Sequence, residues 1–261
     1  VGGGHAVVEA DIPCGPWGCV VDGTNPLCKE LIPVGGVFVL ARRLLAEGAV
    51  DAIDAAPAWR GVRVYRSGFA GDGLVDYIPL IRRPLVRRMF YTYLYRETWL
   101  HILDGSAGFP VERACEALET KVAAWHGEGE LERCLETLGD DLETLRKMEV
   151  LAGEALARVS LIAREACKPV PDGEWIQRTW KDIPAIDLEI ETLGRSHPPL
   201  MPPETLFGFG KEALEGKELA PMMESALGLY GDRKAHYSIL AGVIGRLDEK
   251  QVKARRGSCH T

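Results

Sequence analysis

The sequence predicts an α/β or α+β fold, with a mixed sheet in residues 1–110 and a largely helical remainder. Two observations lead to this prediction. Short apolar runs bounded by glycine and proline recur before residue 110, as is typical of strands. After Pro110 the apolar residues recur at steps of three and four, which is the period of a helix. The 261 residues suffice for one large domain or two small ones.

Three segments near the start of the chain have the character of strands. Residues 19–21 are apolar and β-branched and run into an Asp-Gly turn. Residues 34–40 form an uncharged run that predicts a buried strand, with a short helix expected near 41–48. Residues 61–67 alternate apolar and polar side chains, which predicts a half-buried strand.

The middle of the chain is expected to be one long helical region, residues 111–168. A helix is predicted over 111–125, because Pro110 suits a helix start and Gly127 and Gly129 follow its end. An apolar stripe at heptad-like spacing then begins at position 131, and it suits either the sheet of the same chain or a partner helix. Its members are Leu131, Leu135, Leu138, Leu142, Leu145, Met148, Ala152, Leu156 and Val159.

The remaining residues, 169–261, are expected to form an irregular proline-rich loop and C-terminal helices that complete the same domain as the sheet. Helices are predicted near 203–214 and 220–229, with a last element over 234–246. Residues 159–162, just before this part, suit a strand as well as a helix.

Charge and composition narrow the class of protein. The net charge of −7 argues against a protein that coats nucleic acid by bulk charge. No apolar run of about 18 residues occurs, so no membrane span is expected. Seven scattered cysteines favour reduced thiols and a cytoplasmic location. The charged, Leu-rich composition with few Asn or Gln is typical of a thermophile.

Cys14, Cys19 and Cys28 cluster near the start but lack the close pairing of a structural zinc site. They are therefore interpreted as small apolar side chains.

Two Asp-Gly-hydroxyl elements are the main candidates for chemistry. Asp22 follows the run 19–21, and Asp104 follows residues 99–103, which are expected to form a strand after a helix over 85–96. Neighbouring strands would bring the two carboxylates together, where Mn²⁺ or Mg²⁺ would bind and support phosphodiester cleavage. Glu97 precedes the second element and is a third candidate ligand. The alternative is that both elements are ordinary turns.

Four arginines lie just before these candidate ligands: Arg82, Arg83, Arg87 and Arg88. They are candidates for binding a DNA backbone. The alternative is a surface that pairs with the glutamates further along the chain.

This order of motifs resembles the archaeal NurA nucleases. The resemblance rests on Asp22-Gly-Thr, on Arg96-Glu97, and on a strand ending at Asp104-Gly-Ser. It implies an RNase H-like core, Mn²⁺-dependent processing of DNA ends, and cooperation with a hexameric helicase. The family's late tyrosine and histidine correspond to Tyr230 and His236.

The resemblance also gives a counterpart for the family's middle strand. In the family that strand is followed by a basic residue and then an acid. Here Val159–Arg164 corresponds to the strand and the base, and Asp182 or Asp187 to the acid.

Three classes of function follow. The first is a metal-dependent nuclease that binds two metals through Asp22, Glu97 and Asp104, with His236 and Tyr230 in catalytic positions. The second is a non-enzymatic scaffold or accessory subunit that uses the helical stretch to bind a second copy or a partner protein. The third is a small-molecule enzyme with its pocket at the strand ends.

Overall fold

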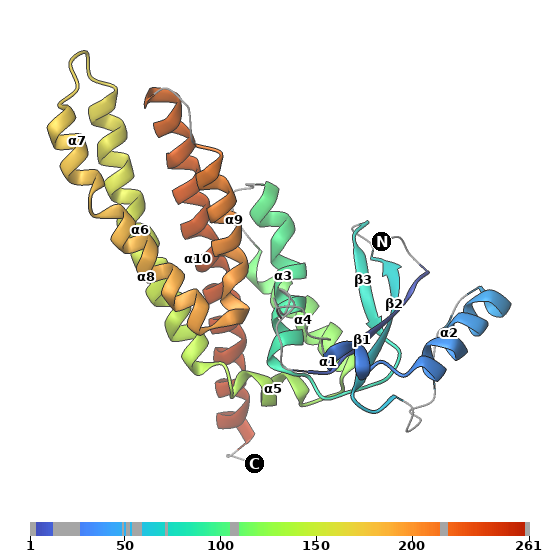
Figure 1. Cartoon of the computed structure of the whole chain (residues 1–261). Helices are drawn as coiled ribbons and strands as arrows, with labels where there is room; N and C mark the ends of the chain where they lie inside the picture. The colour runs from blue at the N-terminus through green and yellow to red at the C-terminus, as the bar shows by residue number, and fades with distance from the viewer. Residues whose placement is uncertain are drawn as a thin grey trace. The chain divides into compact units, whose positions relative to one another are not determined.

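The computed structural model describes residues 4–12, 27–48, 50, 53, 59–70, 73–104, 110–214 and 219–258 (Figure 1). The chain divides into two compact units. Unit 1 comprises residues 1–85 and 121–130, and unit 2 comprises residues 86–120 and 131–261. The divisions expected at residues 110 and 168 both fall inside unit 2. Helices with one small antiparallel sheet confirm an α+β fold.

Unit 1 is built on a three-stranded antiparallel sheet in the order β1-β2-β3. The strands are β1 (Ala6–Ala10), β2 (Val62–Phe69) and β3 (Val75–Pro79). Val8 lies opposite Val64, and Ser67 lies opposite Tyr77. The alternating pattern of residues 61–67 therefore predicted the strand β2 correctly, but not its burial, since residues 62–65 are buried on both faces. The expected mixed sheet is wrong for the described strands, because both strand pairs are antiparallel.

The strand expected at 34–40 is instead the first half of helix α2 (Val34–Glu47), which follows the short helix α1 (Leu27–Glu30). Two boundaries explain the helix. Pro33 precedes it, and Gly48 ends it with φ 72°, donating its N–H to the carbonyl of Leu44. The second half of α2 consists of strong helix formers, and the helix extends from them back over the valine-containing first half.

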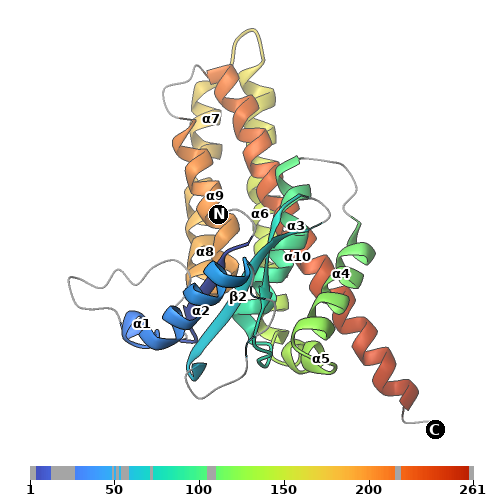
Figure 2. The same ribbon diagram turned by 90° about the vertical axis from the view of Figure 1, so that its right-hand side faces the viewer.

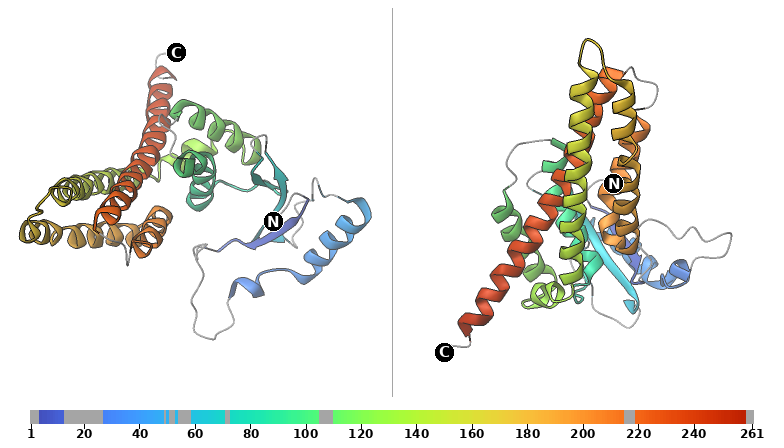
Figure 3. Two further views of the ribbon diagram at one scale, coloured as in Figure 1. Left: turned by 90° about the horizontal axis from the view of Figure 1, so that it is seen from above. Right: turned by 90° about the vertical axis from the view of Figure 1, so that its left-hand side faces the viewer.

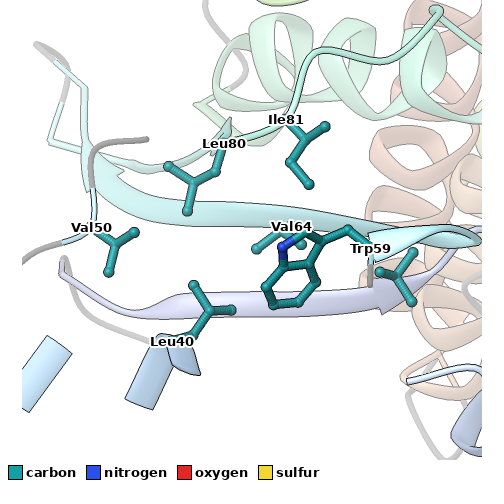
Figure 4. Close-up of a cluster of buried hydrophobic side chains, with 7 residues drawn as sticks. Leu40, Val50, Trp59, Val64, Leu80 and Ile81 are labelled. Atoms are coloured by element: carbon teal, nitrogen blue, oxygen red, sulfur yellow. The ribbon is translucent and has the colours of Figure 1, made fainter. Parts of the chain in front are cut away.

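The core of unit 1 lies between α2 and the sheet (Figure 4). Leu40 is the buried side chain from α2, and the indole of Trp59 packs within the same cluster. Gly36 is also buried, and its missing side chain leaves the space that the Trp59 ring fills. The buried members of the cluster are Leu40, Val50, Trp59, Val62, Val64, Leu80 and Ile81.

Unit 2 consists of helices, and α6 and α10 make its most extensive contact. Figure 2 shows α3 and α4 beside α10, and Figure 3 shows α6 and α8 running along the other helices of the bundle. The elements are α3 (Arg87–Asp104), α4 (Val111–Trp125), α5 (Glu130–Leu135), α6 (Gly139–Ala166), α7 (Gly173–Trp180), α8 (Ile183–Ser196), the short helix η2 (Pro198–Leu200), α9 (Met201–Glu212) and α10 (Leu219–Ser258). The last residues of α4 and the first of α5 belong to unit 1.

The prediction of a helix over 111–125 is confirmed by α4. The strand expected at 99–103 is wrong, because these residues continue α3 as far as Asp104. Nothing between residues 87 and 104 breaks a helix, and the first glycine of the segment is Gly105. Residues 159–162 lie within α6, and the C-terminal elements expected separately near 220–229 and 234–246 form the single helix α10.

Most members of the heptad-like stripe are buried inside unit 2, and Leu142 and Leu156 are half-buried. Leu145, Met148, Ala152 and Val159 are each completely buried on α6, which packs against α10 and α8. The stripe is interrupted between α5 and α6, where Gly139 begins the second helix. Among the described residues, no helix is both long enough and apolar enough to cross a bilayer.

Adjacent glycines on α2 test the packing of unit 1. A Cβ at Gly36 would lie 2.7 Å from two ring carbons of Trp59, whereas a Cβ at Gly35 meets nothing within 4 Å. We expect Gly36→Ala to lower the free energy of unfolding by about 1–3 kcal/mol through overpacking. Gly35→Ala should leave it unchanged or raise it by up to about 1 kcal/mol. Urea unfolding followed by Trp fluorescence measures both, and equal effects would contradict the described position of Trp59.

Candidate functional site

The two predicted metal ligands that the structure describes, Glu97 and Asp104, do not lie at strand ends. Asp22 lies outside the described residues, as do Cys14 and Cys19. Glu97 and Asp104 lie on one helix, α3, and Asp104 is its last residue. The seven residue steps from Glu97 to Asp104 correspond to about 10 Å of helix rise. Within the described ranges, no group of three or more His, Cys, Asp or Glu side chains is placed to hold a metal ion.

Three of the four arginines expected to bind DNA make hydrogen bonds within their own unit. Arg82 Nη2 donates to the Ala124 carbonyl at 3.3 Å, and Arg83 Nη2 donates to the Trp59 carbonyl at 2.7 Å. Arg87 Nε donates to a carboxylate oxygen of Asp141 at 2.7 Å. These guanidinium groups therefore hold segments together. Their partners in these bonds are two backbone carbonyls and one aspartate, rather than the glutamates that the alternative interpretation expected.

The Arg87–Asp141 pair joins α3 to α6. The Asp141 side chain is 1% exposed and also accepts a hydrogen bond of 3.0 Å from the Tyr91 hydroxyl. Burial raises the pKa of Tyr91, and the negative charge of Asp141 raises it further. Tyr91 consequently stays protonated and serves as a hydrogen-bond donor.

Tyr230 and His236, the two predicted catalytic residues, both lie on α10 beside a buried ionic cluster. At its centre the guanidinium of Arg233, 1% exposed, bridges two carboxylates. Its Nη1 donates to Asp187 of α8 at 2.6 Å, and its Nε donates to Glu204 of α9 at 2.9 Å. The cluster therefore ties α8, α9 and α10 together.

The remaining hydrogen-bonding capacity of the two carboxylates is also used. Tyr230 and the ammonium of Lys211 donate to Asp187 at 2.9 and 2.7 Å, and the Tyr237 hydroxyl donates to Glu204. Two negative and two positive groups give a balanced charge. This closed arrangement supplies no unpaired base or nucleophile, so its chemistry is that of a structural cluster.

The pKa values of Arg233 and Tyr230 are both raised within the cluster. Burial alone would lower the pKa of Arg233, but the hydrogen bonds and charge of Glu204 more than offset this and raise it. The pKa of Tyr230 is raised first by burial and then by the charge of Asp187. Tyr230 is therefore a neutral donor to Asp187 at ordinary pH and is not poised to accept a proton.

His236 lies on α10, one residue before Tyr237. Its side chain is buried, and its Nδ1 has no hydrogen-bond partner. Burial lowers its pKa, and the opposing charge of Asp232 only partly compensates. The ring is therefore a neutral, packed imidazole.

An open polar depression lies where α6 begins, next to the end of α8. Thr144 Oγ1 and His197 Nε2 are 3.3 Å apart there. The lining residues are Asp140, Glu143, Thr144, Lys147 and His197. These side chains could hydrogen-bond a polar ligand, but they form no metal-binding group.

The outer face of α2 is an exposed apolar surface among the described residues of unit 1. Gly36 and Leu40 face the core, while five apolar residues at positions i, i+3, i+4, i+7 and i+11 form a second face. Val34, Phe38 and Leu45 are 83%, 63% and 88% exposed. We call this surface the α2 face, and its members are Val34, Val37, Phe38, Ala41 and Leu45.

Sequence reasoning missed the α2 face because residues 34–40 were interpreted as a strand. The spacing of its five members is helical and was the available signal. The ionic cluster had no such signal, since Asp187, Glu204 and Arg233 come from three separate helices.

Comparisons with protein-family models, with curated proteins and with solved structures find no match to this chain.

Removal of the central arginine tests the ionic cluster. We expect Arg233→Met to lower the free energy of unfolding by about 3–5 kcal/mol, because two buried carboxylates lose their cation. Arg195→Met is the matched control, since Arg195 makes an exposed pair with Glu191 and its loss should cost less than about 0.5 kcal/mol. Urea unfolding followed by circular dichroism measures both. A change at Arg233 as small as that at Arg195 would contradict the cluster.

Acidification tests the burial of His236. Its pKa lies below the usual 6.5 in the folded chain, so the unfolded chain binds a proton first as the pH falls. The free energy of unfolding should therefore decrease as the pH is lowered through about 6.5. His236→Leu should show a shallower decrease than the wild-type chain. Urea unfolding at several pH values measures both proteins. If their free energies of unfolding decrease equally as the pH falls, His236 is not buried in its neutral form.

Proposed function

We propose that this chain is a protein-binding subunit of a larger assembly and that the α2 face is its docking surface. The α2 face carries this proposal. An uncharged stripe of large apolar side chains is costly to leave in water, and contiguous exposed apolar surface on a folded protein commonly marks an interaction site. Its spacing of three and four is that of helix-to-helix packing.

The polar groups of the chain support the same conclusion. In the described part of the chain, Tyr230, Arg87, Arg233, Asp141 and Asp187 are all hydrogen-bonded to one another or to other side chains within their own unit. Asp187 alone accepts from three donors. This scaffold or accessory role is one of the classes expected from the sequence, with α2 as the interface in place of the stripe of residues 131–159.

The nuclease hypothesis loses its main argument. It rested on carboxylates at the ends of neighbouring strands of an RNase H-like core, and two of the three candidates lie on one helix. We therefore prefer the assembly subunit. The hypothesis keeps a direct test, which is Mn²⁺-dependent cleavage of DNA by the purified protein.

A change of charge on the α2 face tests the proposed function. We expect Leu45→Glu to lower the native mass of the complexes that contain this protein in extracts of the cells that express it. The reason is that a carboxylate cannot be buried in an apolar interface without a partner. Leu188→Glu is the matched control, because Leu188 is also an exposed leucine, at 61%. Size-exclusion chromatography with immunodetection measures both.

Two results would contradict the proposal. One is an equal elution volume for wild-type, Leu45→Glu and Leu188→Glu proteins. The other is Mn²⁺-dependent DNA cleavage that Asp104→Ala abolishes and Leu45→Glu leaves intact, which would restore the nuclease hypothesis.

A further inference from the structure

We infer that the occupant of the α2 face is a second copy of this chain, packed as an antiparallel helix pair. This inference rests on the proposed function and names its partner. In the pair the two-fold axis passes between Phe38 and Ala41, so each α2 contacts the other through the same surface.

The order of side-chain sizes along the α2 face supports this register. In an antiparallel pair, residues whose numbers have a constant sum lie opposite each other. A sum of 79 places Val34 opposite Leu45 of the second copy and Phe38 opposite Ala41 of the second copy. The largest side chain of the face then meets the smallest, and each such contact occurs twice. This alternation of large and small side chains is what well-packed helix interfaces require.

The charges of α2 favour the antiparallel direction. Arg42, Arg43 and Glu47 are its charged residues, and all three lie in its C-terminal half. Arg43 and Glu47 form a pair of 3.5 Å on the same helix. A parallel pair would place the two Arg42 side chains at the same level, whereas the sum of 79 places each Arg42 opposite Val37 of the second copy, so the two arginines lie five residues apart, about 7.5 Å along the helix axis. Antiparallel helices also have opposed macrodipoles, which is favourable.

The area of the α2 face also fits a second copy. Val34, Val37, Phe38 and Leu45 are 83%, 41%, 63% and 88% exposed, which corresponds to apolar surface on the order of 500 Å². Two such faces together bury on the order of 1,000 Å², the lower limit for a specific interface. A lipid surface is a poorer occupant, because the net charge of −7 is repelled by anionic membranes.

The oligomeric state of the purified full chain tests the inference. Light scattering across a range of micromolar concentrations should give a dimer for the wild-type protein. Leu45→Glu should give a monomer with an unchanged far-ultraviolet circular dichroism spectrum, and Leu188→Glu should remain a dimer. A wild-type monomer at every concentration would overturn the inference, and so would a dimer that Leu45→Glu leaves intact.

Cysteine cross-linking tests the direction of the pair. Phe38→Cys and Ala41→Cys proteins, mixed and mildly oxidised, should form the 38-to-41 disulfide in larger yield than either variant alone. The wild-type chain, which carries the same native thiols, gives the background. Cross-linking of Ala41→Cys to itself in the larger yield would indicate a parallel pair and overturn the proposed register.

The outcomes separate this inference from the proposed function. The purified chain could be a monomer while the complexes in cell extracts still depend on Leu45. This result would overturn the dimer and identify a different protein as the partner. A purified monomer that binds vesicles of neutral phosphatidylcholine through the α2 face would overturn both in favour of a lipid surface. A dimer that depends on Leu45 supports both.

Discussion

The arrangement of unit 2 depends on one buried guanidinium. Arg233 on α10 is held by Asp187 of α8 and Glu204 of α9, and its guanidinium carbon also lies 3.8 Å from the centre of the Phe207 ring. Such a cluster adds little stability compared with an apolar core, but a wrong register of any of the three helices would leave a buried charge unpaired. The cluster therefore selects one arrangement of helices. Since α10 also packs along α6, that selection extends across the unit.

The same physics accounts for the absence of an open active site among these groups. A buried carboxylate is tolerated only with its donors in place, so Asp187, Glu204 and Asp141 each bind tyrosine, arginine or lysine donors. Tyr230, at a catalytic position by resemblance, is a donor to Asp187. His236, the other such residue, is held neutral by burial. Residue types suited to catalysis are here used to fix helices against one another.

The α2 face has the opposite character. Helix α2 is apolar on two sides, and the sheet of unit 1 covers only the side with Gly36 and Leu40. Unlike the stripe on α6, which α8 and α10 cover, the α2 face is left exposed by the described residues of unit 1. An apolar helix face of this size is stable in water only at a cost of free energy, and a second copy with the same face removes that cost.

Local sequence determined the elements that proline, glycine or side-chain alternation marks. Pro110 and Gly127 bound α4 as predicted, and the alternation in residues 61–67 predicted β2, because proline, glycine and side-chain period act over a few residues. Tertiary structure alone decided the rest. Residues 34–40 and 99–103 have the composition of strands but lie in helices, since each run continues into helix-forming neighbours and packs as part of a longer helix. The pairing of Arg233 with Asp187 and Glu204 joins residues 46 and 29 positions apart, and no local pattern specifies contacts that only the packing of three helices brings together.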